Sequence, residues 1–361
     1  MKNHKVLLTQ VTTVLFLACL GSLPVSAQLG AGFVTIDPPQ SVFAFASGIN
    51  DHGKIVGTYF DSGGVSHGFF LRNLDGSFVT IDHPDAQHVS NGGTETRGIN
   101  SAGLIVGDYC AALPCDGVSV IKGYLLTGDE NRDGYDKDDF KTLETPGHIN
   151  SYLVHINSES DIVGCEHDND LMGSMHGIVH DDGKVTRYPV PYSMNDGINE
   201  RGEIVGFYVD TTTGIEHGYL LTKGKATLID FPGAVATTPE DINNRGQVVG
   251  FYNKDNVVHG FIWQKGKFTS VDIPGAVATF VAGINSAGDI VGEYDDATTG
   301  HGYLLCNPDH ADGEGCGEDA QGTTAAQDLT NKSPWVSLPE NVRKSLQRSA
   351  LGRFGIEMMK P

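Results

Sequence analysis

The stretch "GINDHGKIVGTYFDSGGVSHGFFL" at residues 48–71 is one copy of a pattern that recurs along this 361-residue chain. Close variants of its first half are "GINSAGLIVGDY" at 98–109, "GINERGEIVGFY" at 197–208 and "GINSAGDIVGEY" at 283–294. Each of these copies is followed by a glycine-centred triplet such as "HGF" or "HGY". Self-similarity of this kind indicates an array in which one supersecondary unit is repeated and packs against its neighbours.

Three short motifs recur in a fixed order. An asparagine that follows an apolar residue stands at Asn50, Asn100, Asn157, Asn199, Asn243 and Asn285. The I/V-V-G motif ends at Gly57, Gly107, Gly164, Gly206, Gly250 and Gly292, and the H-G-aromatic motif is centred on Gly68, Gly123, Gly177, Gly218, Gly260 and Gly302. Successive asparagines lie 42 to 57 residues apart, a spacing typical of β-propeller blades, which run roughly 40 to 50 residues.

A fourth motif, of the form F-x-T-x-D, is out of phase with the other three. It begins at 33, 78, 140, 185, 226 and 268, so one copy precedes the first asparagine and none follows the last H-G-aromatic triplet. A closed ring explains this offset, because the N-terminal copy would then supply the outer strand of the last repeat.

Each repeat predicts four β-strands. An Asn-x-x-Gly turn separates the first two, and β-branched and aromatic residues alternate with polar ones in all four. The chain is therefore predicted to be all-β, with a six-bladed β-propeller of four-stranded blades over residues 28–306, closed by the N-terminal strand. The rival architecture, a β-solenoid, requires shorter coils without hairpins and is rejected.

The repeats resemble those of the HAF family of extracellular repeat proteins, named for a His-Ala-Phe triplet. Glycine replaces the alanine in His67-Gly68-Phe69 and His217-Gly218-Tyr219, and the second repeat departs further with Lys122-Gly123-Tyr124. The resemblance covers residues 33–305. It implies an extracellular repeat protein and supplies no activity that could be carried over to a particular residue.

The two ends of the chain differ from the repeats. Residues 1–27 combine Lys2 and Lys5, a short apolar run and Val25-Ser26-Ala27, a pattern typical of a cleaved signal peptide. Residues 307–336 are predicted to be a flexible polar linker and residues 337–361 a short helical tail. We therefore expect a secreted or periplasmic protein.

Composition excludes several kinds of partner. The formal net charge is −21, which disfavours nucleic acid and anionic lipid because both require basic patches. No apolar run after the leader is long enough to span a membrane. We expect a monomer that binds an extracellular ligand: a glycan, a protein or a small molecule.

Five cysteines remain once the leader is removed, and export permits them to form disulfides. The local pairs Cys110–Cys115 and Cys306–Cys316 are the expected bonds, which leaves Cys165 free. Spacing alone does not prove this connectivity.

The recurring histidines and tyrosines are interpreted as architectural. A residue that recurs in every repeat is most simply explained by folding and packing. We expect each histidine to satisfy backbone groups of its own or the next repeat. The residues concerned are His67, His176, His217, His259 and His301, with Tyr59, Tyr109, Tyr208, Tyr252 and Tyr294.

Ligand recognition is expected where the repeats differ, on the innermost strands and the loops at one end of the channel. The candidates are Arg97, His155, Glu166, His167, Asp196, Glu240 and Asp241. Paired carboxylates with a histidine can perform acid–base chemistry or hold a cation. The favoured function is a non-catalytic binding module, and the alternative is an enzyme acting on carbohydrate or an ester. Convergence of Asp196, Glu240 and His155 on one pocket would favour the enzyme.

One segment has the composition of a calcium loop. "DENRDGYDKDDF" at 129–140 places oxygen ligands at alternate positions around a glycine, as calcium-binding loops do. The predicted ligands of this structural calcium ion are Asp129, Asn131, Asp133, Tyr135, Asp136 and Asp138. The match is imperfect, because Phe140 stands where an EF-hand would end in glutamate, and a solvated acidic hairpin is the alternative.

Overall fold

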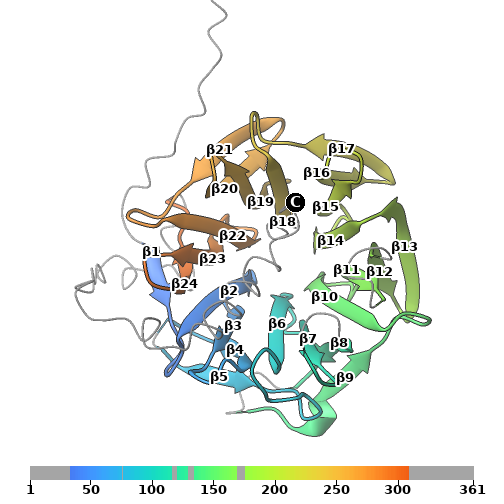
Figure 1. The fold of residues 1–361 in the computed structure, drawn as a ribbon, viewed down its shortest axis with the longest axis vertical. Helices are drawn as coiled ribbons and strands as arrows, with labels where there is room; N and C mark the ends of the chain where they lie inside the picture. Colours follow the sequence, from blue (N-terminus) through green and yellow to red (C-terminus); the bar gives the residue numbers. More distant parts are fainter. Residues whose placement is uncertain (1–32, 75, 116–119, 129–133, 169–174, 309–361) are drawn as a thin grey trace, which may run out of the picture.

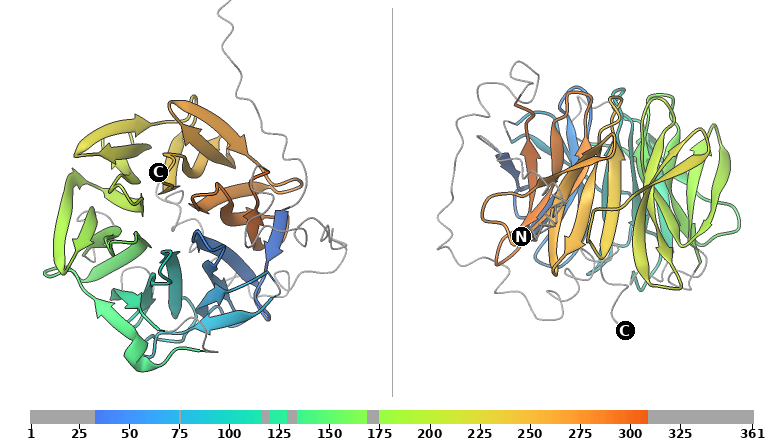
Figure 2. Two further views of the ribbon diagram at one scale, coloured as in Figure 1. Left: turned by 180° about the vertical axis from the view of Figure 1, so that it is seen from behind. Right: turned by 90° about the horizontal axis from the view of Figure 1, so that it is seen from above.

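A computed structural model describes residues 33–74, 76–115, 120–128, 134–168 and 175–308 of the chain (Figure 1). Within these ranges the regular structure consists of β-strands β1 to β24 and one 3-10 turn at Lys137–Asp139. The strands form sheets arranged around a common axis, and Figure 2 shows the same arrangement from behind and edge-on. The fold is therefore a β-propeller built from four-stranded units.

The strands fall into four concentric sets. Those nearest the axis in Figure 1 are β2 (Phe43–Ile49), β6 (Thr94–Ile99), β10 (Asn150–Ile156), β14 (Ser193–Ile198), β18 (Ala236–Ile242) and β22 (Ala278–Ile284). The second set is β3 (Ile55–Phe60), β7 (Ile105–Cys110), β11 (Ile162–His167), β15 (Ile204–Asp210), β19 (Val248–Lys254) and β23 (Ile290–Asp295). The third is β4 (Ser66–Leu71), β8 (Ile121–Leu126), β12 (His176–Asp181), β16 (Ile215–Thr222), β20 (Val257–Gln264) and β24 (Gly300–Leu305). The outer set is β5 (Phe78–Ile81), β9 (Phe140–Leu143), β13 (Lys184–Pro191), β17 (Lys225–Ile229), β21 (Lys267–Val271) and β1 (Phe33–Ile36).

Strands within a unit pair antiparallel to their neighbours in chain order. One sheet is eight-stranded, because a single parallel pair, Glu216 with Ala236, links β16 to β18. The last sheet takes its outer strand from the start of the chain, since β1 pairs with β24 from Phe33 opposite Leu305 to Ile36 opposite Gly302. This is the pairing that the out-of-phase "FVTID" motif predicts.

The repeated asparagine ties each inner strand both to its own turn and to the next unit. In Asn100, Oδ1 accepts hydrogen bonds from the backbone N–H groups of Ala102 and Leu104 at 3.1 and 2.9 Å. Its Nδ2 donates to the carbonyl of Asn157 at 2.9 Å. The same donation, at 3.0 to 3.5 Å, runs from Asn50 to Asn100, Asn157 to Asn199, Asn199 to Asn243, Asn243 to Asn285 and Asn285 to Asn50. Each asparagine is thus both a turn cap and a cross-link between units.

The H-G-aromatic and F-x-T-x-D motifs meet side by side on the outer strands. His217 Nδ1 lies 3.0 Å from Asp230 Oδ2, and the ring of Tyr208 stacks on His217 with centroids 5.4 Å apart. The same trio is Tyr59–His67–Asp82, Tyr252–His259–Asp272 and Tyr294–His301–Asp37. Lys122 pairs with Glu144 where the second repeat departs from the motif. The expectation that these histidines satisfy backbone groups is therefore wrong for these positions: their partner is the carboxylate of the neighbouring motif.

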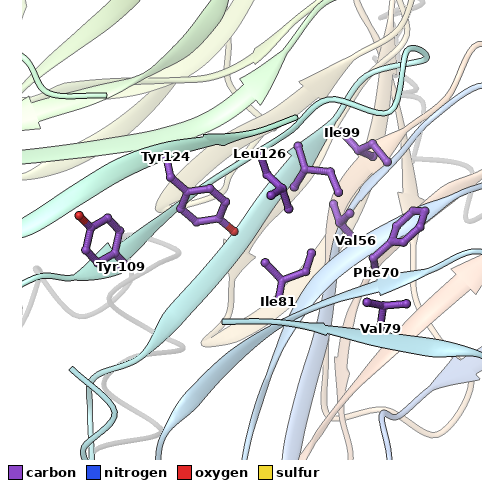
Figure 3. Close-up of a cluster of buried hydrophobic side chains, with 9 residues drawn as sticks. Val56, Phe70, Val79, Ile81, Ile99, Tyr109, Tyr124 and Leu126 are labelled. Atoms are coloured by element: carbon purple, nitrogen blue, oxygen red, sulfur yellow. The ribbon is translucent and has the colours of Figure 1, made fainter. Parts of the chain in front are cut away.

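The hydrophobic core lies between adjacent sheets. Figure 3 shows one such layer, in which Val56, Phe70 and Ile81 of one unit face Ile99 and Leu126 of the next. Removing this apolar surface from water drives the units together. The I/V-V-G glycine permits the inner pair of strands to approach closely, since a Cβ at Gly107 would lie 2.1 Å from the carbonyl oxygen of Glu95.

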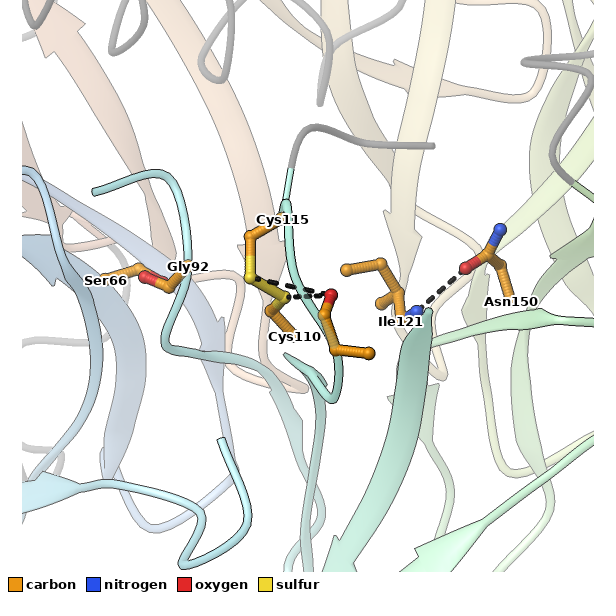
Figure 4. The surroundings of a disulfide bond; sticks show 7 residues. Ser66, Gly92, Cys110, Cys115, Ile121 and Asn150 are labelled. Atoms are coloured by element: carbon orange, nitrogen blue, oxygen red, sulfur yellow. Dashed lines mark hydrogen bonds between the residues drawn. A yellow bond between two sulfur atoms is a disulfide. The ribbon is translucent and has the colours of Figure 1, made fainter. Parts of the chain in front are cut away.

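The cysteines agree with the prediction where the structure describes them. Cys110 and Cys115 form a disulfide with a Cα–Cα distance of 5.7 Å (Figure 4), and Cys165 is free and buried. Cys306 is disulfide-bonded, and its expected partner Cys316 lies outside the described residues.

The predicted leader at 1–27 also lies outside the described residues, as do 309–336 of the predicted linker and the whole tail at 337–361. Among the residues that the structure does describe, no helix is long and apolar enough to cross a membrane.

Replacing Asn100 with alanine should lower the free energy of unfolding by about 2–3 kcal/mol, because it leaves buried backbone groups without their partners. Urea unfolding of wild-type protein and Asn100→Ala measures this loss. His52→Ala changes an exposed side chain at the equivalent turn of the preceding unit and should stay within about 0.5 kcal/mol of wild type. Equal stability of Asn100→Ala and wild type would contradict the cross-linking role of the asparagine.

Candidate functional site

A β-bulge in every inner strand turns one side chain toward the axis. In each inner strand, the residue three positions before the repeated asparagine has no partner on the neighbouring strand. A bulge of this kind changes the direction of the side chain that it leaves unpaired. The skipped residues are Ser47, Arg97, Val154, Asp196, Glu240 and Ala282. All of them line a single axial cavity, together with Phe45, His155 and Met194. The bulge therefore decides which variable residue faces the channel.

The axial cavity is small. Its volume is about 30 Å³, which is room for one or two water molecules. Four of the seven predicted ligand residues, Arg97, His155, Asp196 and Glu240, line it. The convergence of Asp196, Glu240 and His155, which would favour an enzyme, is therefore found, in a space that admits only a small group.

The positive charge of Arg97 is already neutralised. Its Nε donates to Asp108 Oδ2 at 2.6 Å, and its NH2 group donates to Glu95 Oε2 at 2.9 Å. The guanidinium also lies over the ring of Tyr152, 5.9 Å from its centroid. Two carboxylates surround one cation, so this side of the channel carries no surplus positive charge.

His155 and Asp241 form an ion pair across an intervening strand. His155 Nε2 of β10 lies 3.3 Å from Asp241 Oδ1 of β18, while β14 lies between these two strands. Gly197 of β14 leaves the necessary room, since a Cβ there would lie 2.6 Å from the Cα of Asp241. Burial disfavours the imidazolium, but the charge and hydrogen bond of Asp241 outweigh burial and raise the pKa of His155.

Asp196 and Glu240 face the cavity, and neither carboxylate forms an ion pair among the residues that the structure describes. Asp196 is 3% exposed, and its Oδ2 atom has no hydrogen-bond partner among the described residues. Burial, with the nearby charge of Glu240, raises the pKa of Asp196 well above its ordinary value. Burial also raises the pKa of Glu240 to about 8 and that of Glu216, which accepts a hydrogen bond from Thr238, to about 7.

Two predicted ligand residues do not join this site. Glu166 and His167 are buried strand residues of β11 rather than loop residues. Glu166 pairs with Ser151 and His167 with Asn150, so β11 continues past the I/V-V-G motif. Glu166 forms an ion pair with Arg187, and His167 stacks on Tyr152 with centroids 5.3 Å apart. Both side chains already have protein partners and do not line the axial cavity.

The predicted calcium loop falls partly on undescribed residues. Asp129, Asn131 and Asp133 lie outside the described ranges. Of the other predicted ligands, the ring of Tyr135 lies 6.5 Å from that of Phe140, the N–H of Asp136 donates to Asp139 Oδ2 at 2.7 Å, and Asp138 is exposed. Calcium binding at this loop stays a prediction.

The sequence prediction missed the carboxylates that set the charge of the site. Glu95 could have been found, because it stands two residues before Arg97 and therefore on the same face of a strand. Asp108 and Glu216 carry no such signal. Each lies on a different strand from the cavity residue that it influences, and only the folded register brings them close.

The raised carboxyl pKa values predict a pH dependence of stability. Carboxyl groups of the unfolded chain titrate near their ordinary pKa of about 4, so the folded protein binds more protons between about pH 4 and 8. Their contribution favours folding at the acid end of this window and is lost as the pH rises through 7 and 8. We expect Asp196→Asn and Glu240→Gln to increase the free energy of unfolding at pH 8 and to leave it nearly unchanged at pH 5.

Chemical denaturation between pH 5 and 8 measures this difference. Glu159→Gln, which removes an exposed carboxylate from the turn between β10 and β11, serves as the matched control and should show no such pH-dependent gain. A destabilisation at pH 8 by both cavity variants would contradict the raised pKa values of these buried carboxyl groups.

No protein-family model and no curated protein matches the sequence. Among solved structures, the chain is similar to Pyrococcus horikoshii acylaminoacyl peptidase, at 12% identity and a TM-score of 0.44, over 76% of this chain and 53% of the peptidase. It thus spans about half the length of that enzyme. It is also similar to a streptogramin B lyase, at 14% identity and a TM-score of 0.41 over 76% of this chain and 98% of the lyase. A further similarity is to the six-bladed fungal lectin of Aleuria aurantia, at 13% identity and a TM-score of 0.44, over 71% of this chain and 90% of the lectin. At these identities and TM-scores the similarities carry no information on function.

Proposed function

We propose that this protein is an exported, non-catalytic binding module whose axial channel receives one small cationic group of an extracellular ligand. The observation that carries the proposal is the buried carboxylate oxygen of Asp196, which lines the cavity and has no hydrogen-bond partner among the described residues. A buried charge without a partner is costly. A cation that enters the cavity would relieve that cost.

The closed, six-bladed form of the propeller and membership of the HAF-repeat family are part of this proposal. Each of the six inner strands is followed directly by the repeated asparagine, and one strand pair, Glu216–Ala236, joins two repeats into the eight-stranded sheet. The pairing of β1 with β24 and the hydrogen bond from Asn285 to the carbonyl of Asn50 support closure. The recurrence of His-Gly-aromatic triplets beside the asparagine and I/V-V-G motifs supports the family.

Charge around the cavity favours a cationic ligand. Arg97 is balanced by Asp108 and Glu95, and His155 by Asp241. The negative charges of Asp196 and Glu240 have no ion-pair partner of their own among the described residues. The charge of Arg97 lowers their pKa values, but burial raises them by more. A ligand cation would favour the ionised form of these two carboxyl groups, whose pKa values burial raises.

The size of the cavity favours a primary ammonium group over a whole sugar or peptide. A volume of about 30 Å³ accommodates a group about as large as one or two water molecules. The remainder of the ligand would lie outside the cavity, at the mouth of the channel. Amino sugars and lysine side chains both present such a group on a larger body.

Hydrolysis of a carbohydrate or an ester is the second candidate. It is favoured by carboxyl groups of raised pKa beside a histidine, which is a feature of acid–base sites. It is disfavoured by the cavity volume, because a scissile bond with its two flanking groups requires more space. The binding role is therefore the better supported of the two.

Glucosamine oligomers test the proposal, with the corresponding N-acetylglucosamine oligomers as the uncharged comparison. We expect wild-type protein to bind the amine form, and Asp196→Asn or Glu240→Gln to weaken that binding by at least about tenfold, the loss expected when a buried charged contact is removed. Isothermal titration calorimetry provides the affinity. Chromogenic glycosides and esters incubated in parallel should not be hydrolysed.

The control is Glu159→Gln, which makes the same charge change at an exposed position and should retain wild-type affinity. Equal binding of the amine and acetylated forms, or an equal loss in Glu159→Gln, would show only non-specific attraction to an acidic protein and overturn the proposal. Hydrolysis that depends on Asp196 would favour the enzyme instead.

A further inference from the structure

The first repeat unit contains a cluster of metal-binding side chains that the other Tyr–His–Asp trios lack. His67 Nδ1 lies 2.9 and 3.2 Å from the two carboxylate oxygens of Asp82. The ring of His88 lies nearly parallel to that of His67, with centroids 6.3 Å apart. One ligand atom from each of His67, Asp82 and His88 lies within 4.8 Å of the others, and no second group of this kind occurs among the described residues.

An insertion brings His88 to this place. The connection between β5 and β6 runs over residues 82–93, whereas the equivalent connections at 230–235 and 272–277 are half as long. His88 belongs to the longer connection. The trios at His217, His259 and His301 have the same tyrosine and aspartate neighbours, and no second imidazole joins them in the part of the chain that the structure describes.

The connection that carries His88 is held on both sides of that residue. The N–H of Gln87 donates to the carbonyl of Cys110 at 2.8 Å, beside the Cys110–Cys115 disulfide. On the other side, Ser66 donates to the carbonyl of Gly92 through its N–H and its hydroxyl, at 2.9 and 3.1 Å. Figure 4 shows Ser66, Gly92 and the disulfide side by side. His88 is therefore positioned by its anchored neighbours, although its own side chain is exposed.

A second carboxylate, that of Asp61, lies beside the other ring nitrogen of His67. Asp61 Oδ1 accepts hydrogen bonds from the N–H groups of Gly63 and Val65. These bonds fix the carboxylate so that Oδ2 lies 3.7 Å from His67 Nε2. The turn that carries Asp61 is tied to the inserted connection, because the N–H of Asn91 donates to the carbonyl of Gly64 at 3.0 Å.

We propose that His67, Asp82 and His88 form a binding site for a divalent transition-metal ion of the zinc class. Two imidazoles with a carboxylate suit zinc, whereas calcium and magnesium prefer all-oxygen sites. A bound ion would join β4, the end of β5 and the inserted connection. It would thereby stabilise the outer edge of the first unit.

Calorimetric titration of the full chain with zinc chloride tests the site, with magnesium chloride as the hard-cation comparison. We expect saturable binding of one zinc ion per chain and none of magnesium at this site. His88→Gln removes an exposed ligand, so it should leave the fold intact. It should weaken zinc binding by at least about tenfold, because even mutations of residues around the metal ligands lower metal affinity by that factor. Cobalt(II) absorption should show the same loss of a four-coordinate spectrum.

His301→Gln is the matched control, because it removes the histidine of an equivalent trio that has no second imidazole. It should bind zinc as the wild type does. Asp82→Asn compared with Asp272→Asn makes the same comparison for the carboxylate. No saturable zinc binding by wild-type protein, unchanged affinity in His88→Gln, or an equal loss in His301→Gln would each overturn the proposal.

Discussion

The hydrogen bond from each repeated asparagine to the carbonyl of the next is the contact on which the rest of the structure depends. Each four-stranded unit has two apolar faces and is stable only when both are covered, so the units must be held in order around the axis. The asparagine does this with one side chain. Its oxygen shapes the turn between the first two strands, and its nitrogen reaches the turn of the following unit.

The chemistry of the channel is a consequence of the same geometry. A bulge three residues before each asparagine leaves one side chain unpaired, and the asparagine cross-links bring these six side chains to one axis. The backbone of the repeats is thus uniform, while the bulge position accepts serine, arginine, valine, aspartate, glutamate or alanine. The backbone architecture can therefore stay the same while the charge and polarity of the channel lining change.

The strands could be predicted from the sequence because they recur, and recurrence separates architectural residues from variable ones. Arg97, His155, Asp196 and Glu240 were located on the same grounds, since they occupy positions where the repeats differ. Glu166 and His167 were misplaced because their strand continues past its motif. The histidine–aspartate pairs were missed because the two motifs are distant in the chain and only the strand register joins them. Asp108 and Glu216 were missed for the same reason.

The pairing of β1 with β24 makes the last sheet depend on the N-terminal strand. Thr35 and Tyr294 are in contact although 259 residues separate them in the chain, so the last sheet is assembled from the first and last parts of the polypeptide. Proteolytic trimming beyond Phe33 would remove the outer strand and uncover the backbone edge of β24. An uncovered edge of this kind is a template for pairing with another molecule. The N-terminal strand therefore protects the protein from self-association.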